Sequence, residues 1–355
     1  MQDDVISTRY IKVDPGCPDP AVIAEAARVL RRGGLVAFPT ETVYGLGVNA
    51  LDGTAVARLF AVKGRPADNP LIIHVAGRDM LFQLAGQVPE KAVLLMDTFW
   101  PGPLTLVLPG GKGIPAGVTG GLDTVAVRMP DHPVALALIR AADLPVAAPS
   151  ANISGRPSPT TAGHVLGDLA GKVEVVLDGG PAGLGVESTV LDLTAPAPLI
   201  LRPGGVTPES LREVLGTVEV HPDVRTDFER PGAAPSPGLK YTHYAPKTPL
   251  LLVEGSPDPV AAKIVDLARQ YRAKDLRVGI LSCTGRKEFY GEGEVLPAGG
   301  GDDPAAVAAG LYAALRRFDE LAVDIILAEG IKDEGIGLAV MNRLRKAAGR
   351  RLLKV

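Results

Sequence analysis

Residues 19–39 read "DPAVIAEAARVLRRGGLVAFP" and encode a helix followed at once by a strand. Asp19 can cap the helix, Pro20 suits its first turn, and Gly33 suits its end. The apolar run Leu35–Pro39 that follows is typical of a short buried strand. Because helical and strand-like runs keep alternating through the first two-thirds of the chain, the sequence predicts an α/β or mixed α+β sheet domain.

The other candidate strands of this domain are short, rich in Val, Ile and Leu, and bounded by Gly or Pro. They are Arg9–Val13, Pro70–Val75, Leu104–Leu108, Val125–Met129, Val146–Ala148, Val173–Leu177, Thr189–Leu193 and Ile200–Arg202. A second capped helix, "TPESLREVLG" at 207–216, closes the pattern. The domain is therefore predicted to span residues 1–217.

The composition changes over residues 218–249, where proline becomes frequent and periodicity disappears around "RPGAAPSPGLKYTHYAPKTP". We expect a Pro-rich linker here. Its segment "KYTHY" is unusual, because a plain spacer does not need two tyrosines, a lysine and a histidine. Strands and helices alternate again over residues 250–355, which predicts a small Rossmann-like parallel α/β domain.

The composition points to a folded protein without a strong overall charge. Of the 355 residues, 46% are hydrophobic and 22% are charged, so a sizeable buried core is expected. The net charge of -3 argues against binding to nucleic acid or a membrane through the overall field. Cys17 and Cys283 lack metal or disulfide spacing, the first residues lack a signal-peptide pattern, and no apolar run reaches membrane-spanning length. These features predict a soluble, cytoplasmic protein.

Polar and charged residues gather at the ends of several candidate strands. The segments that contain them are "FPTETVYGLG" (38–47), "KGRPADNPLIIHV" (63–75), "LDTVAVRMP" (122–130), "PVAAPSANISGRPSPT" (145–160), "ESTVLDL" (187–193) and "LILRPG" (199–204). Strand ends are where α/β folds bind ligands. Four cations at such positions, together with several hydroxyls, suggest a cleft for a strongly anionic small ligand, such as a triphosphate with a carboxylate. The cations are Lys63, Arg65, Arg128 and Arg202.

Taken one at a time, these residues also have purely structural explanations. Lys63 and Arg65 could end a helix in solvent, where cations suit the helix dipole. His74 could be a hydrogen-bonded core histidine, and Arg128 could pair with an acidic side chain. The histidines show no metal-binding spacing, and neither a Ser-His-Asp triad nor a pair of catalytic carboxylates is evident. The residues therefore indicate an anion-binding α/β enzyme that works by positioning and charge neutralisation.

Taken together and in this order, six motifs resemble the threonylcarbamoyl-AMP synthase, or YrdC-like, family. They are "PTETVYGLG", "KGRPADNPL", "TVAVRMP", "APSANISG", "ESTV" and "LRPG". The segment "PSPGLKYTHYAP" and the C-terminal domain resemble the two-domain members, so the resemblance spans essentially the whole chain. It implies a YrdC-like twisted mixed sheet with helices, followed by the Rossmann-like domain.

The resemblance also implies an activity. Members of this family are nucleotidyltransferases that make L-threonylcarbamoyladenylate and pyrophosphate from L-threonine, bicarbonate and ATP, with Mg²⁺ accompanying ATP. The product would pass to a tRNA threonylcarbamoyl transferase complex. That complex forms N6-threonylcarbamoyladenosine at position 37 of tRNAs that read codons beginning with A.

Residues at the matching positions receive roles from the same resemblance. The catalytic set would be Lys63, Arg65, Ser150 and Asn152. L-Threonine would be bound by Thr42, His74, Arg128, Ser150 and Ser188. ATP would be bound by Arg65, Asn69, Thr124, Asn152, Arg202 and Tyr244, with a hydroxyl from Ser158 or Thr160. Tyr244 and the linker would close over the nucleotide, and no protein side chain would act as a metal ligand.

Two other classes of protein compete with the synthase. A non-catalytic double-stranded RNA-binding module would use a concave basic surface, but the net charge of -3 and arginines within apolar strands count against it. A carbamoyl-transfer domain of the hydrogenase-maturation type would be accompanied by acylphosphatase and zinc-finger segments, which this sequence lacks. We therefore expect the synthase, with no strong direct binding to nucleic acid.

Overall fold

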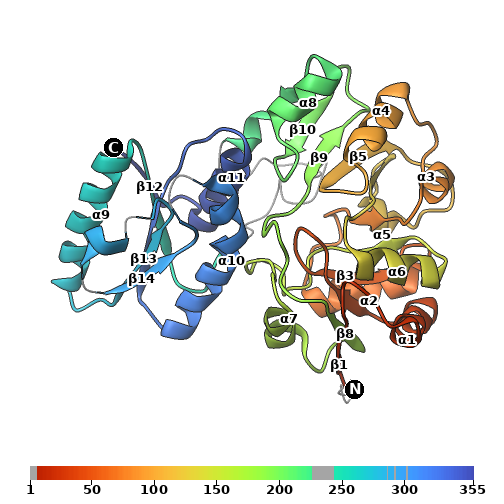
Figure 1. The fold of residues 1–355 in the computed structure, drawn as a ribbon, viewed down its shortest axis with the longest axis horizontal. Helices are drawn as coiled ribbons and strands as arrows, with labels where there is room; N and C mark the ends of the chain where they lie inside the picture. The colour runs from red at the N-terminus through yellow and green to blue at the C-terminus, as the bar shows by residue number, and fades with distance from the viewer. Residues whose placement is uncertain (1–5, 226–243, 286, 292, 301–302) are drawn as a thin grey trace.

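The computed structural model describes residues 6–225, 244–285, 287–291, 293–300 and 303–355, which form two lobes, each built on its own sheet (Figure 1). Most of the predicted linker, residues 226–243, lies outside the described residues. Both sheets carry helices, so the predicted mixed α/β fold followed by a smaller parallel α/β unit is confirmed. Within the described residues, no helix combines the length and the apolar character needed to cross a membrane.

The first lobe contains a mixed sheet of eleven strands in the order β1-β8-β2-β3-β7-β4-β6-β5-β9-β10-β11. Its strands are β1 (Arg9–Lys12), β2 (Val36–Phe38), β3 (Gly45–Asn49), β4 (Ile72–His74), β5 (Leu104–Pro109), β6 (Thr124–Arg128), β7 (Val146–Ala147), β8 (Val175–Asp178), β9 (Thr189–Asp192), β10 (Leu199–Arg202) and β11 (Glu219–Val220). All nine strands predicted for this lobe are present. The last strand, β11, pairs with β10 just beyond residue 217.

Eight helices accompany this sheet in the described part of the lobe: α1 (Pro20–Arg31), α2 (Gly53–Lys63), α3 (Arg78–Leu84), α4 (Glu90–Phe99), α5 (Ala116–Thr119), α6 (Pro133–Ala142), α7 (Ala162–Leu169) and α8 (Pro208–Leu215). Helix α1 begins as predicted, because the Asp19 side chain accepts a hydrogen bond from the amide of Ala21 and Pro20 occupies the first turn. Its apolar face packs with α6 against β2 and β8, which places a core on that side of the sheet.

Strand β3 was not predicted, because "GLGVN" reads locally as a glycine-rich turn. In the fold, Gly47 pairs with Val36 of β2. A Cβ atom at Gly47 would lie 2.7 Å from the Phe38 ring and 2.8 Å from Val146 Cγ1. Glycine is therefore required here by close packing within the sheet, which is the usual reason for a buried glycine in a strand.

The second lobe contains a five-stranded parallel sheet in the order β14-β13-β15-β12-β16. Its elements are β12 (Leu250–Glu254), α9 (Pro257–Arg272), β13 (Val278–Ser282), β14 (Glu294–Pro297), α10 (Pro304–Leu321), β15 (Ile325–Glu329), α11 (Ile336–Ala348) and β16 (Leu352–Lys354). The predicted strands and helices are all present, while the short strands β14 and β16 are additional. Helices α10 and α11 lie on the side of this sheet that faces the first lobe, and α9 lies on the outer side (Figure 1).

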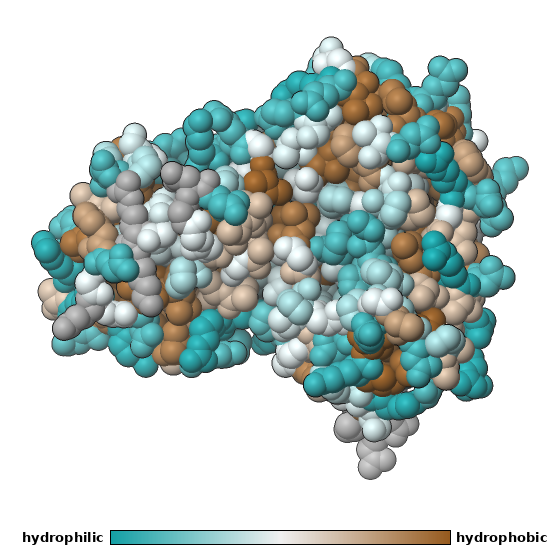
Figure 2. Space-filling model, in the orientation of Figure 1, coloured by the Kyte–Doolittle hydropathy of each residue, from teal (hydrophilic) through white to brown (hydrophobic). Residues whose placement is uncertain are grey.

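A single apolar cluster joins the two lobes. It combines Val43 and Val186 of the first lobe with Tyr244 and with buried residues of α10, α11 and the second sheet. On the face of the molecule in Figure 2, hydrophilic residues dominate the outline and hydrophobic residues form small separate groups, one of them where the lobes meet. The lobes are thus packed together through a shared core.

Candidate active site

A pocket of about 670 Å³, a volume that includes solvent at its mouth, opens in the first lobe. Ten of the residues predicted for the site line it: Thr42, Arg65, His74, Arg128, Ser150, Asn152, Ser158, Ser188, Arg202 and Tyr244. They come from seven separate sequence segments, the six strand-end segments and the predicted linker, and the three arginines are the cations of the group. The fold therefore gathers these ten predicted polar residues around one cavity.

Arg128 and His74 occupy register partners at the last positions of the neighbouring parallel strands β6 and β4. Arg128 is 4% exposed, donates from Nη1 to Thr42 Oγ1 at 2.9 Å, and lies 2.5 Å from Glu41 Oε1 through Nη2. The contact with Glu41 is an ion pair without hydrogen-bond geometry. The structural explanation for Arg128, pairing with an acidic side chain, thus applies here, and the guanidinium also faces the pocket.

His74 is a neutral histidine in this pocket. Burial, and then the positive charge of Arg128, lower the pKa of His74 to about 3. Its Nδ1 lies 3.3 Å from the Ile72 carbonyl oxygen, which can only accept, so Nδ1 carries the proton. The Nε2 atom is then a hydrogen-bond acceptor, suited to a hydroxyl or ammonium group of a ligand.

Lys63 differs from the expectation that it would face phosphates or solvent. It is the last residue of α2, followed by Gly64 in the left-handed conformation, and it is only 2% exposed. Its amino group donates to the carbonyl oxygens of Ser150 and Asn152, both at 2.5 Å. Burial, and then the charge of Arg65, lower the pKa of Lys63 well below its ordinary value. Lys63 therefore supports the polar loop from behind and does not line the pocket.

Arg65 lines the pocket, and two of its nitrogen atoms are held by the turn that follows it. Nε donates to the Asn69 carbonyl oxygen at 3.2 Å and Nη2 to that of Pro70 at 2.9 Å. The side-chain amide of Asn69 is 1% exposed, and neither its nitrogen nor its oxygen has a hydrogen-bond partner among the described residues. The Oδ1 atom of buried Asn152 also has no hydrogen-bond partner in the described part of the chain, whereas its amide nitrogen donates to the carbonyl oxygens of Ile153 and Arg156. Buried polar atoms without partners are costly, so both side chains are candidates for contact with a ligand.

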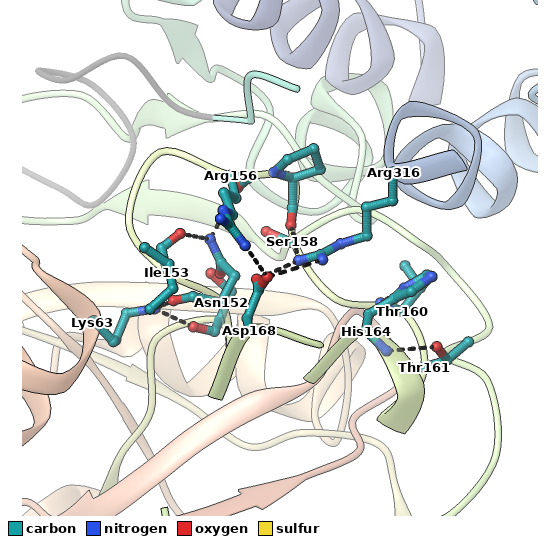
Figure 3. A network of polar contacts seen from close by, with 12 residues as sticks. Lys63, Asn152, Ile153, Arg156, Ser158, Thr160, Thr161, His164, Asp168 and Arg316 are labelled. Carbon is teal, nitrogen blue, oxygen red and sulfur yellow. Dashed lines mark hydrogen bonds and ion pairs between the residues drawn. The ribbon is translucent and has the colours of Figure 1, made fainter. Parts of the chain in front are cut away.

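The structure of loop 156–160 distinguishes Ser158 from Thr160, the two alternative hydroxyls for ATP binding. Ser158 lines the pocket and donates to Glu187 Oε1 at 2.5 Å, whereas the Thr160 hydroxyl lies 3.4 Å from His164 Nδ1 on α7. Figure 3 shows this loop beside α7, with Thr160 and His164 on its far side from Lys63. The geometry favours Ser158 over Thr160 as a pocket hydroxyl.

Arg202 at the end of β10, Ser188 just before β9, and Thr105 on β5 form a hydrogen-bonded row. Arg202 donates from Nε to the Ser188 carbonyl at 3.1 Å and from Nη2 to Ser188 Oγ at 3.1 Å, and Ser188 Oγ lies 2.8 Å from Thr105 Oγ1. Thr124 is not brought to this group: it begins β6, opposite Pro109, roughly 13 Å along the strand from Arg128. Thr124 and Thr160 are thus the two predicted hydroxyls that do not line the pocket.

Three further polar side chains line the pocket without having been predicted: Thr40, Arg156 and Glu187. Glu187 stands directly before Ser188 in the recognised motif "ESTV", so its position at the site could have been predicted from the sequence. Its contacts with Arg343 and Tyr312 could not, because these two residues belong to the other lobe.

The comparisons with known proteins agree with this geometry. Residues 28–204 match the Sua5/YciO/YrdC family model, described as telomere recombination, and residues 206–349 match the threonylcarbamoyl-AMP synthase C-terminal domain. The threonylcarbamoyl-AMP synthase of Pyrococcus abyssi is 52% identical over 93% of this chain and 95% of its own length. The synthase of Bacillus subtilis is 52% identical over 94% of both chains.

A solved structure extends the likeness to three dimensions. The crystal structure of P. abyssi Sua5 complexed with L-threonine superimposes with a TM-score of 0.93 at 50% identity, and covers 98% of this chain and 99% of that one. Escherichia coli YciO, at 26% identity and a TM-score of 0.52, covers 56% of this chain. The chain therefore belongs to the Sua5/YciO/YrdC family, and within it to the two-domain threonylcarbamoyl-AMP synthases.

Proposed function

We propose that this protein makes L-threonylcarbamoyladenylate and pyrophosphate from L-threonine, bicarbonate and ATP. The observation that carries the proposal is the convergence of Arg65, Arg128 and Arg202 in one pocket whose wall includes Ser150 and Asn152. Three ligand anions, a carboxylate, a carbamate and a triphosphate, have to meet during this reaction, and such a cluster of cations, two of them buried and Arg65 half-buried, offsets their mutual repulsion.

L-Threonine fits the end of the pocket formed by Thr42, His74, Arg128 and Ser188. The guanidinium of Arg128 is suited to bind a carboxylate through two parallel hydrogen bonds, once the ligand displaces Glu41 from its ion pair with Arg128. His74 Nε2, as an acceptor, is suited to the threonine hydroxyl. Ser150, on the adjacent loop, belongs to the same proposed contact set.

ATP would occupy the side of the pocket formed by Arg65, Asn152, Ser158, Arg202 and Tyr244. Asn69 does not line the pocket, but it lies on the turn whose carbonyl oxygen accepts from Arg65, and it belongs to the same proposed set. The unpartnered side-chain amide of Asn69 and the unpartnered Oδ1 atom of Asn152 support this assignment, because polar groups of the nucleotide would satisfy them. Thr124 and Thr160, which belong to the same expected set, receive no such support from the pocket. The threonine amine and bicarbonate would form a carbamate with loss of water, and an oxygen of that carbamate would then attack the α-phosphorus as pyrophosphate leaves.

Mg²⁺ belongs to this proposal as the companion of ATP. Among the described residues, no three His, Cys, Asp or Glu side chains are grouped to hold a metal ion. In nucleotide sites, Mg²⁺ is bound mainly by phosphate oxygens and water, with one or two carboxylates. The triphosphate of ATP would therefore supply most of its ligands. When bound, it would neutralise charge on the leaving pyrophosphate.

The test is pyrophosphate release from ATP by the full chain. Release should require both L-threonine and bicarbonate, and it should yield an adduct with the mass of threonylcarbamoyladenylate. Release that is absent, or indifferent to threonine, would reject the proposal. Transfer of the product to tRNA by a separate threonylcarbamoyl transferase complex, and a cytoplasmic location, are parts of the same proposal.

The alternative of a non-catalytic RNA-binding module is not favoured. Arg128 and Arg202 are 4% and 6% exposed, so their charges face the pocket and are not displayed on a surface that a duplex could contact.

A further inference from the structure

Glu187 lies on the boundary between the pocket and the second lobe. It is 6% exposed and lines the pocket, and its carboxylate is bound from both lobes. Ser158 donates to Oε1 at 2.5 Å, Arg343 Nε donates to Oε2 at 2.8 Å, and the Tyr312 hydroxyl lies 3.0 Å from Oε2. Two of the three donors therefore come from helices α10 and α11 of the second lobe.

Arg343 is fully buried, and its side chain crosses between the lobes. Nη1 donates to the carbonyl oxygen of Pro203 at 2.9 Å, next to Arg202. The guanidinium carbon lies 5.2 Å from the centre of the Tyr244 ring, which itself stacks on Tyr312 with centroids 5.5 Å apart. The side chain of Arg343 thus contacts Glu187 and Pro203 of the first lobe and Tyr244 of the predicted linker.

The backbones of the two lobes meet closely beside these contacts. Gly185, two residues before Glu187, has φ +77°, and a Cβ atom there would lie 2.3 Å from the Ala308 carbonyl oxygen on α10. A second ion pair lies nearby, where Arg316 of α10 contacts Asp168 at 2.8 Å and the Pro157 carbonyl at 2.6 Å. Asp168 also accepts from Arg156 of the pocket wall at 2.7 Å (Figure 3). The interface therefore holds the pocket wall in a defined position.

Glu187 is ionised in this arrangement. Burial raises the pKa of its carboxyl, but the charges of Arg343 and then Arg202 outweigh burial, and the pKa lies below its ordinary value. A carboxylate in the wall of a triphosphate site repels the ligand unless its charge is compensated. Arg343 supplies the larger compensating charge from outside the pocket, and Arg202 supplies a smaller one from within it.

We propose that Arg343 of the second lobe is a positioning residue of the ATP site, which neutralises Glu187 and holds the Tyr244 ring in the pocket wall. This inference rests on the proposed function for the identity of the nucleotide. It gives the C-terminal domain a defined part in the reaction, because the pocket of the first lobe then depends on a cation that only the second lobe provides.

The test compares single and double variants of the full chain. Arg343→Met removes the larger of the two positive charges that balance Glu187 and leaves only that of Arg202, so we expect the KM for ATP to rise about tenfold or more, with a change of less than about threefold in the KM for threonine. Adding Glu187→Gln to Arg343→Met removes the repelling charge, and part of the ATP affinity should return. Tyr312→Phe keeps the ring against Tyr244 but loses one hydrogen bond, so we expect a smaller rise.

Arg345→Met is the matched control. Arg345 lies on the same helix, is 9% exposed, and pairs with Glu254 at 2.9 Å and Asp333 at 3.2 Å, both in the second lobe. It should lower the melting temperature without changing the KM for ATP. If the control raises that KM as much as Arg343→Met, general loosening of the second lobe explains the effect and the inference fails.

Other outcomes are equally decisive. An unchanged KM for ATP in Arg343→Met overturns the inference, and so does a double variant that is no better than the single one. If Arg343→Met does not fold, Tyr312→Phe decides, and an unchanged KM for ATP in that variant rejects the inference. Calorimetric titration with a non-hydrolysable ATP analogue separates the two proposals: loss of binding in Arg343→Met supports the inference even if the wild-type chain releases no pyrophosphate.

Discussion

Replacement of Arg128 by lysine tests the threonine site most directly. The guanidinium uses Nη1 for Thr42, Nε for the Gly102 carbonyl at 3.2 Å, and Nη2 for Glu41. A single ammonium group cannot hold these positions and also fork onto a carboxylate. Lysine keeps the buried positive charge, which matters because removing it would leave Glu41 unpaired at a cost of about 3–5 kcal/mol.

The expected magnitude follows from the bonds that are lost. A carboxylate bound to lysine forfeits at least one of two charge-assisted hydrogen bonds, each contributing about 1.5–3 kcal/mol. The KM for L-threonine should therefore rise by about 10- to 150-fold. The KM for ATP should change by less than about threefold, since the proposed nucleotide contacts lie elsewhere in the pocket.

The assay is the initial rate of pyrophosphate release at saturating ATP and bicarbonate, with threonine varied. Arg140→Lys, on the exposed side of α6, makes the same chemical change away from the pocket and serves as the control. Thermal unfolding of both variants checks that the fold is retained. If Arg128→Lys melts like the wild type and keeps its KM for threonine within twofold, the assignment of Arg128 to the substrate carboxylate is refuted.

Three further predictions concern residues in or directly behind the pocket wall. Lys63→Met removes both hydrogen bonds to the carbonyls of Ser150 and Asn152, so kcat should fall at least about tenfold and the melting temperature should drop; a fully active variant would contradict the supporting role. Asn69→Ala should raise the KM for ATP without lowering the free energy of unfolding, because its buried amide has no partner among the described residues; denaturant unfolding that shows a large loss would contradict this. Since the pKa of His74 is about 3 in the fold, the unfolded chain binds the extra proton between about pH 3 and pH 6.5, and stability rises with pH across that window. His74→Asn should flatten that rise by up to about 1.4 kcal/mol per pH unit in urea titrations at several pH values, and an unchanged slope would count against a buried neutral imidazole.

Local rules were sufficient for most of the secondary structure. Helix α1 begins at Asp19 and Pro20 and stops before Gly33, because capping and turn preferences act over a few residues. The strand in "GLGVN" escaped this reasoning, since Gly47 is required by contacts with Phe38 and Val146, and Val146 is about 100 residues away in the chain.

The residue types of the site could also be recognised from the sequence, because a strongly anionic ligand demands cations and hydroxyls at strand ends. The directions in which these side chains point could not be recognised from the sequence. Arg65 and Lys63 are two residues apart, yet one lines the pocket and the other supports a loop from behind. A helix that ends between them turns the two side chains to different sides, and no composition or spacing rule contains that information.

The sequence by itself determined the fold class, the polar segments and the family to which they belong. Only the tertiary structure decided how charge is balanced within the site, because each balancing pair joins residues far apart in the chain. Arg128 meets Glu41 across 87 positions and Arg343 meets Glu187 across 156 positions. A buried charge is stable only beside its partner, and which partner reaches it depends on how strands and lobes pack in space.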